Sequence, residues 1–258
     1  MSLMATDDVG PQDSGASGVT DADAAVVAGE PAPSQRVPLS PERVVGAALD
    51  FIEEHGLANL TMRKLGERLG VEAMSLYRHV PGREELLDEV VARIVAEMDD
   101  DDDVLAAPQD GWQDFLQRLA HGVRRVALKH PVAFPLVASR PLEAPWLRPP
   151  LRSVDWVERF LDGLIDEGFS DANAVGAYRA FTSFLLGHLL LEVASHGADL
   201  GPLDVLEDDE RGERLAGFPT LLRLREALSE DHAGVEFEEA LEELLQRIAL
   251  MHANAGDR

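Results

Sequence analysis

Apolar residues recur every three or four positions along most of the chain, which is the spacing of an α-helix with one buried face. No alternation of apolar and polar residues is long enough to predict a strand. The sequence therefore predicts an all-α fold. The expected helices span about residues 41–55, 62–69, 72–80, 83–98, 112–129, 132–138, 152–167, 171–196, 219–229 and 235–252.

Residues with particular backbone preferences mark several of the expected helix ends. Ser40, Thr61 and Ser170 stand where a side-chain oxygen can accept a hydrogen bond from the first turn of a helix. Gly56 and Gly70 follow predicted helices, and glycine enters the left-handed region at little cost. These positions give the expected boundaries of the first two helices and the start of the long helix.

Residues 61–83 form the most informative segment. Two short predicted helices flank a tight turn at Gly70, where Val71 fills the corner. Leu76 and Val80 point inward from the second helix, which Pro81 ends. Its other faces carry Ser75, Tyr77, Arg78 and His79. This is the layout of a helix-turn-helix, whose second helix enters the major groove of DNA.

The charge of that segment differs from the charge of the whole chain. The chain has 23 Lys and Arg against 48 Asp and Glu, a net charge of -25, which alone argues against a nucleic-acid partner. Residues 61–83 hold five Lys and Arg against two Glu, which leaves +3 where a phosphate backbone would lie. Residues 1–37 are acidic and rich in Gly, Ala, Ser and Pro, so we expect a disordered acidic tail.

Five consecutive aspartates begin the segment 99–111. Such a run can bind a hard cation, but the spacing of an EF-hand is absent. We interpret the segment as a solvated acidic linker, and we expect no metal site.

Compartment signals favour the cytoplasm. The chain has no cysteine and its first ten residues do not resemble a secretory signal. The apolar helix 171–196 suggests a membrane span, but Arg179, His188 and Glu192 interrupt it. We therefore expect a helix buried by two neighbours, and no membrane.

Several spaced motifs between Ser40 and Met98 resemble the N-terminal domain of the tetracycline-repressor (TetR) family of bacterial transcription regulators. They are the opening SPERVVGAALDFIEEHG, the lead-in Leu60–Leu65, the turn Leu69-Gly70-Val71, the run Leu76–Val80, and the helix that begins Arg83-Glu84-Glu85-Leu86-Leu87. A looser resemblance to the subfamily of the tetracycline repressor itself continues to Met251. It rests on residues 184–192, Phe218-Pro219 and 237–245.

The resemblance implies a domain organisation. Residues 38–82 would form a three-helix DNA-binding domain, 83–98 a connecting helix, and 112–253 a helical ligand-binding and dimerisation domain. A homodimer would form through the long helix and the last helix. The last helix carries an apolar stripe spaced four and three residues apart, which needs a partner helix in a second chain or in its own. Its members are Phe237, Leu241, Leu244, Ile248 and Met251.

The resemblance also assigns DNA contacts. Arg63 would read a base, because arginine can bond guanine O6 and N7 together. Ala73, Met74 and Ser75 would face base edges. Phosphate contacts would come from Tyr77, His79 and Arg83, while Arg78 suits either role. Ala73 and Met74 depart from the glutamine and proline of the tetracycline repressor, so its operator is not carried over. The alternative for each arginine is a solvated surface charge, and for Tyr77 and His79 it is packing.

The C-terminal half is expected to hold an apolar pocket with a few polar contacts for a small molecule. The candidates are His121, Arg125, Trp146, Arg179, Ser183 and His188. Each is individually more typical of a structural residue. They do not clearly repeat the metal–tetracycline site of the family's namesake, so neither tetracycline nor a cofactor is predicted. No phosphate-binding loop, zinc-protease motif or nucleophile elbow indicates an enzyme.

The predicted function is a ligand-responsive, dimeric transcriptional regulator, a repressor that a small molecule releases from a palindromic double-stranded DNA operator. The alternative is a helical protein that binds a ligand or a partner without specific DNA recognition. The net charge of -25 is the main support for that alternative.

Overall fold

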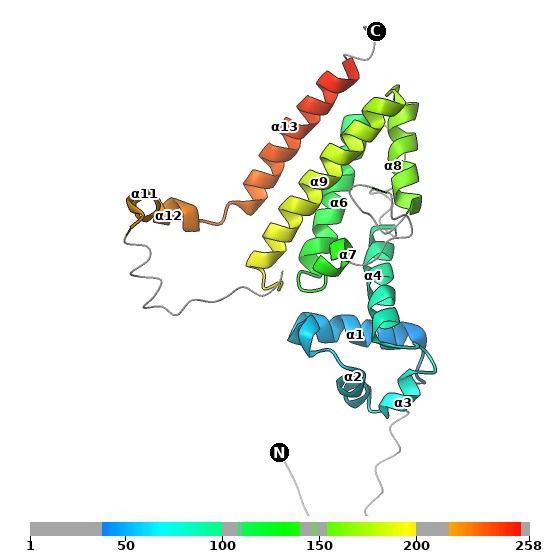
Figure 1. The fold of residues 1–258 in the computed structure, drawn as a ribbon. Coiled ribbons are helices and arrows are strands. Elements are labelled where there is room, and N and C mark those ends of the chain that lie inside the picture. Colours follow the sequence, from blue (N-terminus) through cyan, green and yellow to red (C-terminus); the bar gives the residue numbers. More distant parts are fainter. Residues whose placement is uncertain are drawn as a thin grey trace, which may run out of the picture. The chain divides into compact units, whose positions relative to one another are not determined.

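The computed structural model describes residues 38–99, 108, 110–139, 147, 154–199 and 217–253. Every element among them is a helix (Figure 1), which confirms the all-α prediction. The described residues from Leu39 onward belong to one compact unit. The predicted acidic tail, most of the acidic linker and Trp146 lie outside the described residues, and the predicted domain boundaries stay predictions.

The N-terminal helices are α1 (Pro41–His55), the 3-10 helix η1 (Leu57–Asn59), α2 (Met62–Leu69), α3 (Ala73–Leu76) and α4 (Arg83–Asp99). The Ser40 hydroxyl accepts a hydrogen bond from Arg43 N at 3.2 Å, and the Thr61 hydroxyl accepts one from Lys64 N at 3.2 Å. Gly70 ends α2 in the left-handed region at φ 68°. The predicted ends of α1 and α2 are therefore confirmed.

The predicted second helix of the motif, residues 72–80, is too long. α3 ends at Leu76, and the chain continues as turns in which His79 N donates to Leu76 O at 2.9 Å. Pro81 disfavours helical backbone at Val80, so the tighter turn replaces a further helical turn. Leu76 and Val80 are buried as expected.

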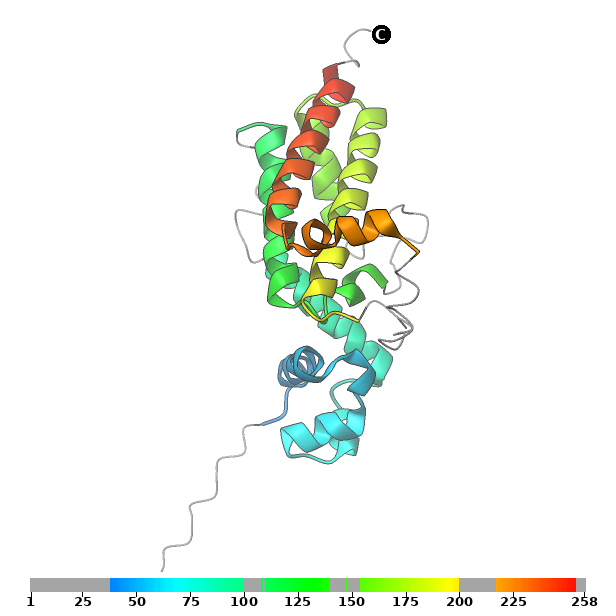
Figure 2. The ribbon, with the colours of Figure 1, turned by 90° about the vertical axis from the view of Figure 1, so that its left-hand side faces the viewer.

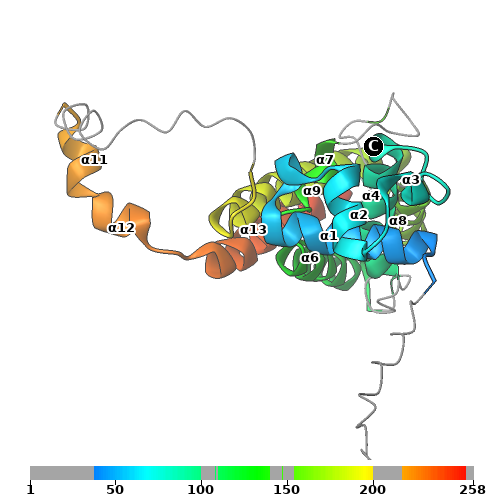
Figure 3. The ribbon, with the colours of Figure 1, turned by 90° about the horizontal axis from the view of Figure 1, so that it is seen from below.

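α2 and α3 meet through a glycine. A Cβ on Gly66 would lie 2.9 Å from Val71 O and 3.1 Å from Ala73 N. Only a residue without a side chain permits this approach, which sets the angle of the helix-turn-helix. α1 in turn contacts α2 and α4 (Figure 3).

The C-terminal helices are α6 (Trp112–Lys129), α7 (Pro135–Ser139), α8 (Val154–Asp166), α9 (Asp171–Ser195), α11 (Pro219–Arg223), α12 (Arg225–Ser229) and α13 (Ala233–Ala253). The limits of α6 match the prediction. The expected helix 132–138 begins later, at Pro135, because a turn follows Pro131. The expected helix 219–229 is two helices, with a break at Leu224.

α9 is the central helix of this half. It contacts α6, α8 and α13, and α13 runs alongside it (Figures 1 and 2). It is long and apolar enough to cross a membrane, with a mean hydropathy of 1.3. Its buried residues Ala177, Phe181 and Leu189 instead pack in the protein core, which is the expected arrangement.

The stripe on α13 is covered within the chain. Phe237, Leu241 and Ile248 are almost fully buried, as is Leu245, whereas the predicted member Leu244 is only half-buried. Because α13 contacts α9 of the same chain, the partner helix that the spacing required is an internal one.

Candidate nucleic-acid interface and effector region

The surface of α2 and α3 presents large side chains to solvent above a closed core. The Arg63 side chain is 81% exposed, Met74 is 71% exposed and Tyr77 is 44% exposed. Arg78 is also exposed, while Ala73, Ser75 and His79 are half-buried. Leu65 and Leu76 lie beneath them with no exposed surface. The segment thus presents an exposed row of side chains over a buried core.

Arg63 is only weakly held within the chain. Its Nε lies 3.7 Å from Glu67 Oε1, one helical turn away, and both side chains are largely exposed. An exposed pair of this kind contributes about 0–1 kcal/mol. The guanidinium can therefore exchange Glu67 for a base edge at little cost.

Arg83 is placed differently. Its Nε donates to Leu60 O at 3.2 Å, its Nη2 donates to Leu57 O at 3.3 Å, and its Nη1 lies 3.3 Å from Glu84 Oε1. These contacts tie the start of α4 to η1. A phosphate contact by Arg83 stays a prediction, and it would compete with a structural role.

Arg68 was counted in the positive charge of the motif, but a carboxylate neutralises it. Its Nη1 and Nη2 donate to the two oxygens of Glu54 at 2.6 and 2.5 Å. The hydrogen bonds from Arg68 lower the pKa of Glu54. The pair joins α2 to α1, and it could not be predicted from the sequence because 14 residues separate the partners.

Two predicted ligand residues converge on Phe237. The His121 ring lies 5.8 Å from the Phe237 ring, and the His188 ring lies 5.2 Å from it. His121 Nε2 is also 3.5 Å from Glu238 Oε2. The buried Nε2 of His188 has no hydrogen-bond partner among the described residues.

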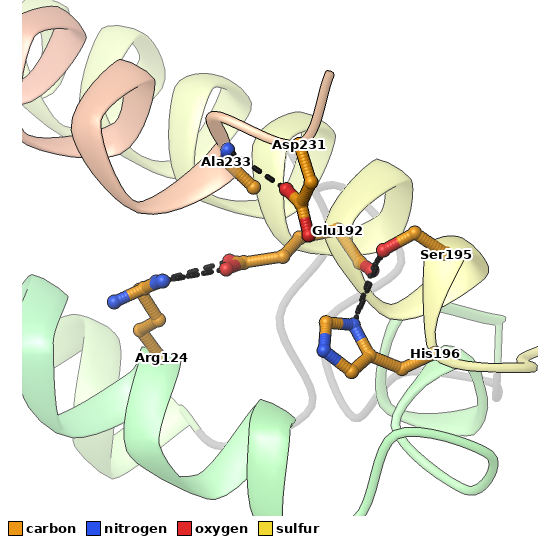
Figure 4. A network of polar contacts seen from close by, with 6 residues as sticks. All are labelled: Arg124, Glu192, Ser195, His196, Asp231 and Ala233. Atoms are coloured by element: carbon orange, nitrogen blue, oxygen red, sulfur yellow. Dashed lines mark hydrogen bonds and ion pairs between the residues drawn. The ribbon is translucent and has the colours of Figure 1, made fainter. Parts of the chain in front are cut away.

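Sequence reasoning chose Arg125 and missed its neighbour Arg124. Arg124 Nη2 donates to Glu192 Oε1 at 2.6 Å and its Nε donates to Oε2 at 3.0 Å (Figure 4). Its guanidinium carbon lies 5.1 Å from the Phe237 ring centre. Glu192 is buried, and its backbone oxygen accepts from the Ser195 hydroxyl at 2.6 Å. The sequence signal for this pair was Glu192, an acidic residue within an apolar helix, because a buried charge requires a partner.

The remaining predicted ligand residues do not join this cluster. Arg125 is exposed on α6, and Arg179 and Ser183 are exposed on α9. The latter two belong to a row at every fourth position, which we call the α9 stripe: Val175, Arg179, Ser183, Gly187 and Leu191.

The described residues also border two cavities. A cleft of about 910 Å³ is lined by His55, Leu57, Arg83, Val132, Leu136 and Leu190, among others. A shallower one of about 490 Å³ lies beside Phe51 and Lys64. None of the five predicted ligand residues that the structure describes, namely His121, Arg125, Arg179, Ser183 and His188, lines either cavity.

Comparison with known proteins decides the family. Residues 44–90 match the model of the bacterial regulatory proteins of the tetR family, and residues 106–251 match the tetracyclin repressor-like C-terminal domain. The tetracycline repressor protein class D of Escherichia coli is 31% identical over 227 residues, covering 85% of this chain and 96% of that protein. The chain belongs to the TetR family.

Solved structures agree with this assignment. A possible TetR family regulator from Streptomyces coelicolor A3(2) is 27% identical with a TM-score of 0.64, covering 82% of this chain and 99% of that one. TetR from Acinetobacter baumannii AYE is 26% identical with a TM-score of 0.62, covering 83% and 99%. A variant of the Acinetobacter protein in complex with minocycline is 25% identical with a TM-score of 0.57, covering 83% and 99%.

This TetR protein is a ligand-responsive, DNA-binding transcriptional repressor, as predicted. The family is regulatory rather than enzymatic, and its members are soluble proteins that bind operators and effectors and act as dimers.

Proposed function

We propose that two copies of the chain bind a near-palindromic operator and that a small molecule held by the C-terminal helices releases them. The exposed row on α2 and α3 carries this proposal, because Arg63, Met74 and Tyr77 protrude where the core beneath is fully buried. Two such rows would read half-sites one helical turn of about 10–10.5 base pairs apart, or a multiple of it.

Within each half-site, some side chains would contact base edges and others would contact phosphate. Arg63 would bond a guanine, and Ala73, Met74 and Ser75 would meet base edges, where the Met74 side chain suits the methyl group of thymine. Tyr77 and His79 would contact phosphate, which sets the register and not the sequence. Arg78 could serve either purpose, and Arg83 would add a phosphate contact only if it released the carbonyls of Leu57 and Leu60.

The test is fluorescence anisotropy with the promoter DNA beside the gene of this protein and with base-substituted versions of it. We expect Arg63→Ala to lose about 1–3 kcal/mol on the preferred sequence and less on the sequence changed at the contacted guanine. Arg223→Ala, which removes an exposed arginine from α11, is the matched control and should bind as the unchanged protein does. A loss from Arg63→Ala that is equal on all sequences would refute its base-reading role.

The dimer would form through the outer face of α9 and the adjoining face of α13. Leu191 is 74% exposed although it is a large apolar residue, and a Cβ on Gly187 would meet nothing within 4 Å among the described residues. A neighbouring helix can approach closely over such a small residue. Arg179 and Ser183 belong to this α9 stripe, so we assign them to the dimer interface rather than to the effector.

The effector would be a molecule with fused or aromatic rings. The core between α6, α8 and α9 is packed with aromatic side chains, namely Phe115, Trp156, Phe160, Tyr178 and Phe181, which would stack on a ring that entered between these helices. Relatives are named as tetracycline repressors, and one solved relative holds minocycline. His121 and His188 stay candidate contacts, as do Arg125 and Trp146. Release of labelled promoter DNA by minocycline tests this class, and no release at saturating minocycline would argue against it.

The net charge of -25 supports one alternative, a cytoplasmic partner-binding protein that has lost DNA recognition. The same anisotropy measurement separates the two functions. Equal affinity of the unchanged protein for its own promoter and for unrelated DNA would favour the alternative.

A further inference from the structure

A short turn between α6 and α7, residues 129–133, is held from two helices of the N-terminal half. Pro131 stops α6, so the N–H groups of Val132 and Ala133 lack the acceptors that a continuing helix would provide. Glu53 of α1 supplies them: its Oε1 accepts from Ala133 N at 2.9 Å and its Oε2 accepts from Val132 N at 3.2 Å. One carboxylate thus satisfies two backbone donors that are 79 and 80 residues away.

A second carboxylate holds the other end of the same turn. Glu97 of α4 lies 2.7 Å from Lys129 Nζ and 3.0 Å from His130 Nε2 through its Oε2. His130 is buried, and Ala133 has no exposed surface. The turn is therefore fixed to α1 at one end through partly buried hydrogen bonds and to α4 at the other, where Lys129 is 63% exposed and His130 is buried.

We propose that Glu53 and Glu97 form a clamp on residues 129–133 that fixes the orientation of the DNA-binding helices relative to the C-terminal half. This inference rests on the proposed function, because orientation matters only if two recognition surfaces must fit one operator. α1 carries Glu53 and packs on α2, so movement of the turn would move the helix-turn-helix as a body. A rigid orientation sets the distance between the two recognition surfaces of a dimer and leaves each surface itself unchanged.

That distinction gives the clamp a measurable signature. A full palindrome requires both surfaces at the right separation, whereas a single half-site requires only one intact surface. Loosening the clamp should therefore weaken binding to the full site and spare binding to the half-site. A residue that merely stabilises the fold would weaken both.

The experiment compares full-length Glu53→Ala with the unchanged protein on duplexes that carry one or two half-sites of its promoter operator. We expect full-site affinity to fall roughly tenfold, within the usual range of coupling between sites, and half-site affinity to stay within twofold. Asp50→Asn is the control, because it removes the same charge from an exposed position of α1. It should lower neither affinity.

A milder variant guards against misfolding. Glu53→Gln keeps a carbonyl oxygen that can accept from one of the two amides, so we expect a loss between those of the unchanged protein and Glu53→Ala. Hydrogen exchange of the peptide covering residues 129–139 should be faster in both variants, and more so in the alanine variant.

Equal losses on full and half-sites, or no loss on the full site, would overturn the clamp, as would unchanged hydrogen exchange. Failure of the unchanged protein to prefer its operator is a separate outcome. It would remove the proposed function and the clamp's role with it.

Discussion

The N-terminal helices and the C-terminal helices each contain an arginine that binds a glutamate through more than one hydrogen bond, but the two pairs lie in different surroundings. Arg68 and Glu54 join α2 to α1 with side chains 30% and 50% exposed. Arg124 and Glu192 join α6 to α9 with side chains 23% and 3% exposed. The shortest distances, 2.5 and 2.6 Å, are nearly equal.

The two pairs have similar distances, but because they differ in burial, removing the arginine should cost a different amount of stability in each. If Arg68 is removed, water can solvate Glu54, and the loss is small. If Arg124 is removed, Glu192 keeps its charge in a site from which water is excluded. Loss of the Arg68–Glu54 pair should therefore be tolerated in the DNA-binding half, whereas the effector half depends on the internal pair Arg124–Glu192.

The largest expected effect on the free energy of unfolding comes from removing the arginine of each pair in a separate variant. Arg124→Ala should lower the free energy of unfolding by about 3–5 kcal/mol, because it leaves a buried carboxylate unpaired and removes the cation from the Phe237 ring. Arg68→Ala should cost about 0–1 kcal/mol. Urea unfolding at one fixed protein concentration measures both, since dimerisation would otherwise alter the apparent stability. Equal losses from the two variants would show that burial does not separate them.

The two halves also use glycine in opposite ways. Gly66 permits backbone contact between α2 and α3, whereas Gly187 faces open space on α9. Gly66→Ala should destabilise the protein by about 1–3 kcal/mol and weaken DNA binding, because Val71 O and Ala73 N must move. Gly46→Ala is the control in α1, where the added Cβ meets only the end of the Arg93 side chain at 3.6 Å.

At Gly46 the substitution should be neutral or stabilise by about 0.5–1 kcal/mol through helix propensity. Thermal unfolding of both variants gives the comparison. A Gly66→Ala protein as stable as the Gly46→Ala protein would mean that the helix-turn-helix relaxes around the added methyl group.

The same contrast explains how far the sequence could predict this molecule. Helix ends in the N-terminal half follow from local chemistry, since Ser40, Thr61 and Gly70 act on residues within one turn. The shortness of α3 was missed because the influence of Pro81 competes with an apolar pattern that continues to Val80.

In the C-terminal half, the predictions depended on which helices and which side chains contact one another, and the sequence does not show those contacts. The α13 stripe required a partner helix, but spacing could not say whether that helix was internal. Arg124 and Arg125 are adjacent arginines that the sequence alone cannot tell apart. They differ only in the structure, where Arg124 of α6 hydrogen-bonds Glu192. Candidate ligand residues were therefore chosen by type, and the five of them that the structure describes are divided between the Phe237 cluster and the outer faces.

The open face of α9 yields a smaller expected effect. Leu191→Glu should weaken the dimer by about 1–2 kcal/mol, because it places a charge where a second copy would bury an apolar side chain. Ile165→Glu on α8 is the control, since Ile165 is also exposed but lies off the α9 stripe. Sedimentation velocity over a concentration series reports the dissociation constants. An unaltered dimer in Leu191→Glu, or equal weakening in both variants, would place the interface elsewhere.

The smallest expected effect concerns the contact between the two halves at Glu97. Burial raises the pKa of its carboxyl, but hydrogen bonds and the charges of Lys129 and His130 outweigh burial and hold the pKa below its ordinary value of 4.5. A group with a lowered pKa contributes stability above its unfolded pKa and loses it as the pH falls through its folded pKa. Because Lys129 is 63% exposed, this contribution should stay below about 1 kcal/mol.

The unchanged protein should therefore exceed Glu97→Gln in stability by a constant amount at neutral pH, and the difference should shrink as the pH falls below about 4.5. Glu89→Gln, on an exposed position of the same helix, controls for the loss of one carboxylate from α4. Urea midpoints between pH 7 and the acid limit of solubility give both differences. A difference that stays the same at every pH would mean that the Glu97 contact stabilises the fold through packing alone, and α4 would then meet the end of α6 without an electrostatic contribution.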